Sequence, residues 1–371
     1  MQCQEVTISL YEGAVPGFAS VEMDRLYQNP FSSLLHHAQH GSIDAMTSTY
    51  VARMNGRVTT ALMFRREKGV VRVLNEQLQI DAGEMERFAR HVYAAYPDVN
   101  IIEFHAVAVH GGRLSLPYQR FHCTEDIVLE LPSDAGAYRA RLGKSTRSYI
   151  SRYMNKLRRE FPDMVHEVRE GGQAAEADLR AIIAMNAARM EGKQHESYID
   201  EAETGRIIEM VRRHGLVSTV RLRGRLCAGA INVRVGGNYF LKVIAHDPAY
   251  DEYRLGTLCC FLTICACIER GGREYHFLWG RYEYKYRLAG VQRDLDHIAV
   301  YRSRRQALRN GRLVLRNALT GCSLEARSWL TTMLREHASL VSAWRRTKHV
   351  LGKPRQAGGA CRVRPQPNDL R

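Results

Sequence analysis

The chain has 371 residues, of which 45% are hydrophobic and 25% charged, an ordinary globular composition with enough length for two domains. Its formal net charge of +15 lies almost entirely after residue 300, where 16 Lys and Arg stand against 3 Asp and Glu. Residues 1–300 hold 38 against 36, and this near-neutral body argues against nucleic-acid binding.

Cysteine usage and hydropathy argue against several other classes of protein. The nine cysteines lack companions at zinc-like spacing, and the four between residues 259 and 267 stand among Leu, Ile, Phe and Ala. This pattern predicts small core residues of one helix and no bound metal. The start, MQCQEVTISLYEG, lacks the features of a secretion signal, and no apolar run reaches the roughly 18–20 residues of a spanning helix. A cytoplasmic protein is expected.

The first half of the chain has the pattern of a β-meander followed by a helix and another strand. Three apolar stretches within residues 47–80 are separated by turn signals, of which Asn55-Gly56 is typical of a hairpin. A helix is expected next, with Asp81 and Glu84 as a capping-box pair. The segment VNIIEFHAVAV then predicts a further strand.

The second half repeats this order. Strands are expected over 216–223, 226–235 and 238–245, then an apolar helix from about Gly256 and a strand over 274–280. The repetition predicts an α/β (α+β) fold of two similar units, each a mixed, mostly antiparallel sheet flanked by helices.

Helices are also predicted between the two sets of strands and after the second. Those between the sets cover 144–160, 179–190 and a stretch capped by Asp200 and Glu203, with a candidate strand at 164–170. The basic extension contains an amphipathic candidate at 327–346, and a Gly/Pro/Arg tail from about Gly352 is expected to be disordered.

The two helices that follow the meanders begin with opposite chemistry. A helix N-terminus offers unpaired N–H groups and a positive dipole end, which suit a phosphate unless acids lie nearby. The first helix begins at Asp81 with three carboxylates by residue 86, whereas the second begins at Gly256, Thr257 and Leu258, with Arg254 just upstream. The second entrance is therefore a candidate pyrophosphate site; alternatively, Gly256 only starts a packed helix.

The order of elements resembles the GNAT superfamily of acyl-CoA N-acyltransferases. The segment FLWGRYEYKYRLAG, residues 277–290, is similar to that after the fifth strand in the branch linked to cellulose and exopolysaccharide biosynthesis, and to FemAB-type ligases built from two GNAT-like units. The resemblance covers about residues 135–300, and residues 1–130 by architecture only. The usual phosphate loop has a second glycine, and this chain aligns only Gly256.

The resemblance implies transfer of an acyl group from acyl-CoA to an amine or hydroxyl. The donor's pyrophosphate would lie on the amides of Leu255 to Leu258, a site formed by the following residues: Arg254, Leu255, Gly256, Thr257 and Leu258. The splayed strand that begins NYFLKVIAHD would pair with the pantetheine arm.

Tyrosine and lysine side chains after the fifth strand are the implied catalytic groups. Tyr284 would protonate the leaving thiolate. The sequence does not exclude its neighbours Tyr282 and Tyr286 from this role. Lys285 would direct a cation at the acceptor or a developing oxyanion. In the alternative interpretations, Tyr284 packs under the sheet and Lys285 is a solvated lysine.

Several side chains could act as general base: Glu283, His246, Asp251 and Glu252. His246 ends a strand where both units would open, and its alternative is a turn histidine. The basic residues of the 144–160 helix are not assigned to the site, because a solvated helix face explains them equally well.

Three functions follow from these features. The first is a cytoplasmic acyltransferase, peripheral at the inner membrane through its basic extension, that uses acyl-CoA to modify a sugar, an exopolysaccharide precursor or an amino compound. The second is a FemAB-like aminoacyl transferase for cell-wall precursors, and the third a catalytically degenerate GNAT-like binding protein. In each case the extension suits an anionic membrane surface or a synthase complex.

The predicted organisation has four parts: a degenerate GNAT-like unit at 1–134, the acyltransferase domain at 135–300, a basic helical extension at 301–351 and a disordered tail at 352–371.

Overall fold

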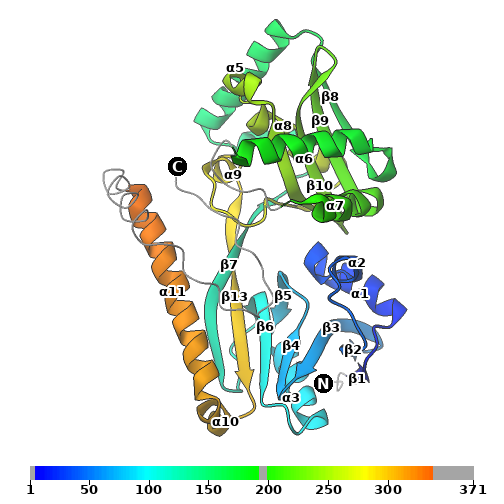
Figure 1. Ribbon diagram of the computed structural model, residues 1–371, viewed down its shortest axis with the longest axis vertical. Helices are drawn as coiled ribbons and strands as arrows, with labels where there is room; N and C mark the ends of the chain where they lie inside the picture. Colours follow the sequence, from blue (N-terminus) through cyan, green and yellow to red (C-terminus); the bar gives the residue numbers. More distant parts are fainter. Residues whose placement is uncertain (1–4, 192–198, 337–371) are drawn as a thin grey trace.

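The computed structural model describes residues 5–191 and 199–336, in which one mixed β-sheet runs through both halves of the molecule (Figure 1). Its strand order is β1-β2-β3-β4-β6-β13-β7-β12-β11-β10-β9-β8, with β5 paired to β6. Parallel pairs join β4 and β5 to β6 and β11 to β12, and the other pairs are antiparallel. The α/β fold of two helix-flanked units is confirmed.

The first unit has a helical layer on each face of its sheet. Its strands are β1 (Val6–Tyr11), β2 (Thr47–Met54), β3 (Arg57–Glu67), β4 (Val70–Val73), β5 (Leu78–Asp81) and β6 (Ile101–His110). One face packs on α3 (Ala82–Ala95), and the other on α1 (Gly17–Tyr27), which is followed by η1 (Pro30–Ser32) and α2 (Leu34–Gln39).

Period-two alternation on β2 and β3 supplies both cores of the first unit. Tyr50 and Leu62 pack with the α3 side, whereas Val51 and Met63 pack with α1. Asn55 and Gly56 have φ of 50° and 77°, the left-handed pair that a two-residue hairpin turn requires.

The predicted capping box at α3 forms only in part. Asp81 caps the helix, since its Oδ1 accepts from the Gly83 N–H at 2.8 Å. The Glu84 carboxylate instead accepts from the Thr60 hydroxyl and pairs with Arg87. The prediction that Glu84 accepts from the Asp81 amide is therefore wrong, and only the Asp81 half of the capping box forms.

The second unit has the same layered plan. Its strands are β8 (Val165–Glu170), β9 (Gly215–Leu222), β10 (Arg225–Val235), β11 (Asn238–His246) and β12 (Glu274–His276). One face carries α4 (Ala135–Arg141), α5 (Lys144–Glu160) and α8 (Leu255–Glu269); the other carries α6 (Glu176–Glu191) and α7 (Glu201–His214). The predicted helices and meander of this unit are confirmed, and Cys259, Cys260 and Cys267 lie in its core.

Two long strands join the units, and sequence analysis did not identify either. These are β7 (Tyr118–Glu130) and β13 (Val291–Tyr301), which pair with each other along most of their length. β13 also pairs with β6, and the end of β7 pairs with β12, so the sheet passes from one unit into the other without a break.

The described part of the extension consists of α10 (Arg304–Arg309) and α11 (Gly311–Glu336). α11 runs beside β7, with Leu313 and Val314 in a small apolar cluster and Gly321 against the Phe121 ring (Figure 1). The amphipathic helix predicted at 327–346 overlaps α11 as far as residue 336; its remainder and the predicted disordered tail lie outside the described residues. Within the described residues, every helix is too short or too polar to cross a membrane.

Candidate functional site

The start of α8 is free of acidic side chains in its first turn. Arg254 is the N-cap residue in the left-handed region at φ 56°, and no side chain caps the helix. The Arg254 carbonyl accepts from the N–H groups of Thr257 and Leu258 at 3.1 and 3.2 Å. Among the described residues, no hydrogen bond reaches the N–H groups of Leu255 and Gly256, so these two donors can bind an anion.

His246 lies directly behind Gly256. A β-carbon at residue 256 would stand 2.9 Å from His246 Nδ1, so only glycine fits beside this ring without a shift. The Nε2 atom lies 2.7 Å from Oδ1 of Asp251, which belongs to η3 (Pro248–Tyr253) between β11 and α8. His246, the predicted base candidate, is thus placed beside the start of α8 and oriented by Asp251.

Two tyrosines of α5 meet the same helix start. Burial raises the pKa of the Tyr149 phenol, and the neighbouring Thr257 side chain lowers it in part. The Arg254 side chain lowers the pKa of Tyr153, and the Arg152 guanidinium lowers it further. The entrance therefore gathers arginine and phenol groups, an environment that stabilises negative charge. Sequence analysis left this helix face unassigned, although tyrosines four residues apart on a basic helix were its visible signal.

The entrance of α3 in the first unit is closed to anions. The Asp81 carboxylate already accepts from the Gly83 N–H, and Glu84 adds a second carboxylate to the first turn. A β-carbon at Gly111 would meet the Asp81 carboxylate, so the acid is also packed in place. Of the two helix starts compared in the sequence, only that of α8 can accept a phosphate.

Strands β11 and β12 separate after three paired residues. Asn238, Tyr239 and Phe240 pair with Glu274, Tyr275 and His276, and β11 then continues to His246 paired only with β10. The edge of β11 from Leu241 onward thus has no strand partner on the β12 side within the described residues. This is the splay expected from the resemblance, and it ends at the α8 entrance.

Tyr284 lies in α9 (Glu283–Arg287), half-buried against the core that contains α8. Burial raises the pKa of its phenol well above the usual range, and the nearby Cys260 thiol acts in the same direction. The raised pKa keeps this phenol protonated. Tyr286, by contrast, is 38% exposed and donates to Gln292 Oε1 at 3.1 Å.

Lys285 is buried, with 3% exposure, and its ammonium is held by the main chain. Nζ donates to the carbonyls of Phe277, Leu278 and Trp279 at 3.0, 3.1 and 2.5 Å. Leu278 lies in the left-handed region at φ 59°, so these bonds secure a strained turn. The geometry favours a positioning role for Lys285, whereas the resemblance implied a cation directed at the acceptor.

The remaining base candidates are occupied by ion pairs. Glu283 is exposed and pairs with Arg287 at 2.6 Å, and Glu252 pairs with Lys156 at the same distance. Asp251 is engaged with His246. Among the described residues, no group of His, Cys, Asp and Glu side chains could hold a metal ion.

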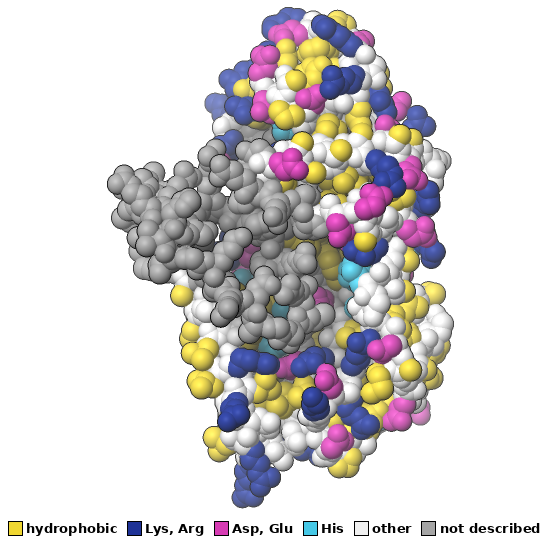
Figure 2. All heavy atoms as spheres, viewed as in Figure 1, with side chains coloured by type: hydrophobic (Ala, Val, Ile, Leu, Met, Phe, Trp, Pro, Cys, Tyr) yellow, Lys and Arg dark blue, Asp and Glu magenta, His cyan; other side chains and the backbone are white. Residues whose placement is uncertain are grey.

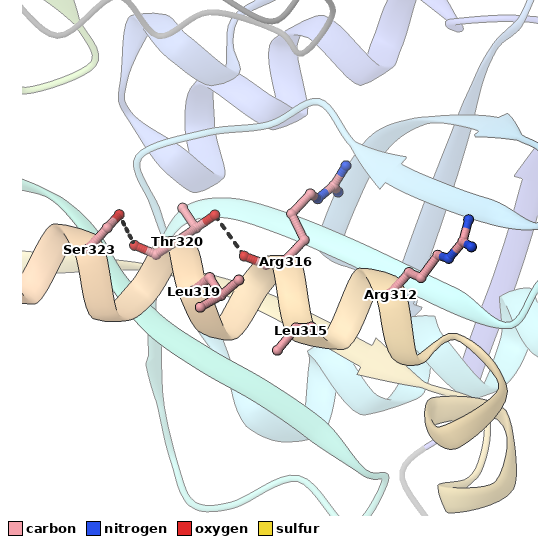
Figure 3. A pocket seen from close by; sticks show the side chains of 6 residues that line it. All are labelled: Arg312, Leu315, Arg316, Leu319, Thr320 and Ser323. Atoms are coloured by element: carbon pink, nitrogen blue, oxygen red, sulfur yellow. Dashed lines mark hydrogen bonds between the residues drawn. The ribbon is translucent and has the colours of Figure 1, made fainter. Parts of the chain in front are cut away.

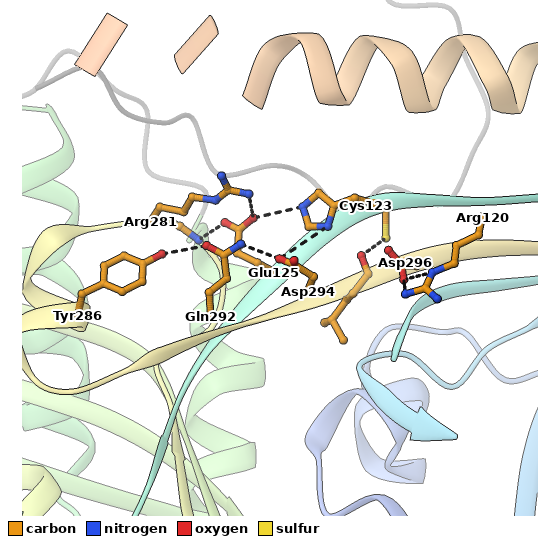
Figure 4. A network of polar contacts seen from close by, with 11 residues as sticks. Arg120, Cys123, Glu125, Arg281, Tyr286, Gln292, Asp294 and Asp296 are labelled. Carbon is orange, nitrogen blue, oxygen red and sulfur yellow. Dashed lines mark hydrogen bonds and ion pairs between the residues drawn. The ribbon is translucent and has the colours of Figure 1, made fainter. Parts of the chain in front are cut away.

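A polar network that sequence analysis missed lines the seam where β7 and β13 join the units (Figure 4). Glu125 accepts from the Gly280 N–H at 3.2 Å and pairs with Arg281. In the same seam His276 is almost fully buried, with Nδ1 2.6 Å from Asp126 Oδ2. No sequence pattern links these partners, because Asp126 and His276 are 150 residues apart.

Residues 144–286 match the family described as acetyltransferase (GNAT) domain, a span that begins with α5 and ends within α9. Among solved structures, FemX has a TM-score of 0.57 at 7% identity, covering 79% of this chain and 96% of FemX. L-PGS from Bacillus licheniformis has a TM-score of 0.46 at 11% identity, covering 82% of this chain and 97% of that one. A tandem GNAT protein from the clavulanic acid biosynthesis pathway has a TM-score of 0.37 at 12% identity, covering 79% and 98%.

No curated protein matches the chain. Residues 144–286 are thus similar to the acetyltransferase (GNAT) domain family, and the likeness to FemX shows a fold that is shared over 79% of the chain.

Proposed function

We propose that the protein is an acyltransferase that moves an acyl group from acyl-CoA to an amine or hydroxyl of a sugar, an exopolysaccharide precursor or an amino compound. The observation that carries this proposal is the start of α8. There the free N–H groups of Leu255 and Gly256 lie next to Arg254, and the first turn contains no acidic side chain. A helix start of this kind suits the pyrophosphate of CoA.

The splay between β11 and β12 supports the same donor. A pantetheine arm contains two amides, which can pair with the open main-chain edge of β11 beyond Phe240. The pyrophosphate would then lie on Leu255 and Gly256, with Arg254 and Thr257 beside its oxygens. His246 would lie behind the glycine as a wall of the site.

The reaction is nucleophilic attack by the acceptor on the thioester carbonyl. The acceptor loses one proton to a base, the C–S bond breaks, and the thiolate takes one proton from an acid. The phenol of Tyr284 is protonated and is proposed to give the second proton as the C–S bond breaks. His246 and Glu283 remain the proposed bases, and Lys285 positions the turn that precedes Tyr284.

The basic extension is proposed to hold the enzyme at an anionic membrane surface or a synthase complex. Figure 3 shows Arg312, Leu315, Arg316 and Leu319 along α11, where the Arg316 guanidinium lies 3.9 Å from Glu103 of β6. Leu315 and Leu319 are 60% and 61% exposed, and arginine beside exposed leucine favours a surface that is both apolar and anionic. The protein would thus be cytoplasmic and peripheral at the inner membrane.

Comparison of two donors tests the proposed reaction. The full chain should bind acetyl-CoA and release thiol in the presence of amino-sugar or amine acceptors, and Tyr284→Phe should suppress the release. Binding of an aminoacyl-tRNA without binding of acetyl-CoA would support the FemAB-like alternative. Binding of acetyl-CoA with no turnover for any acceptor would support a degenerate binding protein.

A further inference from the structure

Lys242 presents a positive charge at the junction of the two units. It is the extra residue of a β-bulge in β11, since Ile231 pairs with Val243 and Asn232 with Leu241. A bulge redirects a side chain out of the regular alternation of a strand. The Lys242 ammonium lies 5.4 Å from the centroid of the Phe31 ring, which belongs to η1 of the first unit.

This charge has no anionic partner within the described residues. Lys242 Nζ makes neither a hydrogen bond nor an ion pair there, and burial lowers the pKa of its amine. The acid that influences it, Glu203, accepts from Arg206 Nε at 2.7 Å and lies 3.9 Å from His40 Nε2. Glu203 is therefore already neutralised by another cation.

The short helix α2 contains further unpartnered polar atoms, and its His36 lies within the influence of the Lys242 charge. Burial, followed by the Lys242 charge, lowers the pKa of His36 to about 2, and burial lowers that of His37 to about 4, so both imidazoles are neutral. Nδ1 of His36 and Nε2 of His37 are buried without a hydrogen-bond partner, as are both amide atoms of Gln39. Buried polar atoms are normally paired with protein, water or a ligand, so such a concentration indicates a site for a polar group.

Aromatic residues fix the geometry of this junction. Phe31 packs into a pocket of the second unit lined by Met210, Val233, Val235, Phe240 and Leu278. Its ring also lies 5.4 Å from that of His36 and 5.9 Å from that of Trp279. Lys285 donates to the Trp279 carbonyl, so the turn after β12 is held next to the same apolar cluster. Figure 2 shows histidine side chains at the waist of the molecule, where the two halves meet.

We propose that Lys242 and the His36 imidazole form an oxyanion-binding subsite, which takes a carboxylate or phosphate carried by the acceptor. The inference rests on the proposed function for its assignment to the acceptor, since β11 is also the strand expected to hold the donor. It narrows the acceptors to anionic molecules, such as acidic sugars, sugar phosphates or amino acids. An unpaired ammonium beside a neutral imidazole that can donate from its unpartnered Nδ1 suits such a group.

The test is NMR of the full chain after reductive ¹³C-methylation of its lysines, which retains their charge. The Lys242 signal is assigned by its absence from Lys242→Arg and is followed while inorganic phosphate, and separately acetate, is added to the unsubstituted protein. A saturable shift of the Lys242 signal is expected, with Lys144, exposed at the start of α5, unmoved. A response to phosphate alone identifies a phosphate-bearing acceptor, and a response to both ions allows a carboxylate.

Two outcomes overturn the inference: no shift of Lys242 with either ion, or equal shifts of Lys242 and Lys144. Calorimetry adds a second readout, in which Lys242→Met should weaken phosphate binding about tenfold and Lys144→Met should leave it unchanged. The failure of the proposed function would look different, because the unsubstituted chain would then not bind acetyl-CoA, whatever the response of Lys242 to phosphate.

Discussion

The imidazole of His246 lies against Gly256, so that a β-carbon at residue 256 would stand 2.9 Å from Nδ1 of the histidine. Gly256 is therefore required by packing, and the proposed phosphate site would require its close approach as well. A substitution at residue 256 alone would confuse these two effects, and a pair of substitutions can separate them.

Gly256→Ala should lower the free energy of unfolding by about 1–2 kcal/mol, because the added methyl displaces the His246 ring. His246→Ala in the same chain should recover most of this loss, which denaturant unfolding of the four variants would measure. Gly205→Ala in α7 is the matched control, since a β-carbon there meets no atom within 4 Å, and should stabilise the protein by about 0.5–1 kcal/mol. Absence of recovery in the double variant would refute the packing account.

Tyr284→Phe should lower kcat for acyl transfer by about 100-fold with KM for acetyl-CoA unchanged, because the leaving thiolate loses its proton donor. Steady-state kinetics of thiol release would measure it. Tyr286→Phe is the control, since that phenol donates to Gln292 away from the core. Equal losses in the two variants, or none in Tyr284→Phe, would remove Tyr284 from the mechanism.

Lys285→Met should destabilise the fold by about 3 kcal/mol, because three carbonyls lose the charged donor that satisfies them. Chemical unfolding is the measurement, and Lys144→Met should stay within about 0.5 kcal/mol of the unsubstituted protein. A variant of normal stability that has lost kcat would instead show that Lys285 acts on the substrate.

The buried pair of His276 and Asp126 should make stability depend on pH. Burial opposes protonation of His276, but Asp126 and then Glu274 outweigh it and raise its pKa above 6.5. A raised folded-state pKa stabilises the protein fully below the unfolded value, and this contribution is lost as the pH rises through the folded value. Unfolding free energy should therefore decline above about pH 6.5.

His276→Gln serves as the reference for this pH effect. Other buried histidines, His36 among them, have lowered pKa values and act in the opposite sense, so the difference between the two proteins isolates His276. The stability gap between unsubstituted and substituted chains should shrink as the pH rises from 6 to 9. A gap that stays constant or widens over this range would contradict the assignment of a charged His276.

The double substitution Leu315→Glu/Leu319→Glu should abolish binding to vesicles that contain anionic lipid, because it places charge on the exposed apolar face of α11. Vesicle sedimentation would measure binding of the full chain. Val21→Glu in α1 is the control, at a residue 69% exposed on the first unit. If the α11 variant sediments like the control, the extension contacts membranes through other residues or binds a protein partner.

The regular elements were predictable because their side chains repeat with a clear period. α5 was expected at 144–160 and spans these residues, with Ile150, Met154 and Leu157 buried. β7 was missed because its apolar residues cluster at one end, around Ile127 to Leu129, while its first half is polar and crosses between the units. A strand of this kind lacks the alternation from which strands are inferred.

The candidate site was predictable where its residues are consecutive and not where they come from distant segments. Arg254 and Thr257 were found from the chemistry of one helix start. Their partners Tyr149 and Tyr153 lie about 100 residues earlier, and only the packing of α5 brings them there. Sequence also could not show whether Lys285 faces solvent or three carbonyls, since both leave the same pattern.

Calorimetric titration of the full chain with acetyl-CoA tests the central claim most directly. One binding site is predicted, which Arg254→Met weakens about tenfold through loss of a charged contact to the pyrophosphate. Arg158→Met, an exposed residue of α5, should bind like the unsubstituted protein. The account would be contradicted if millimolar acetyl-CoA gave no binding heat, or if the two arginine variants lost affinity equally.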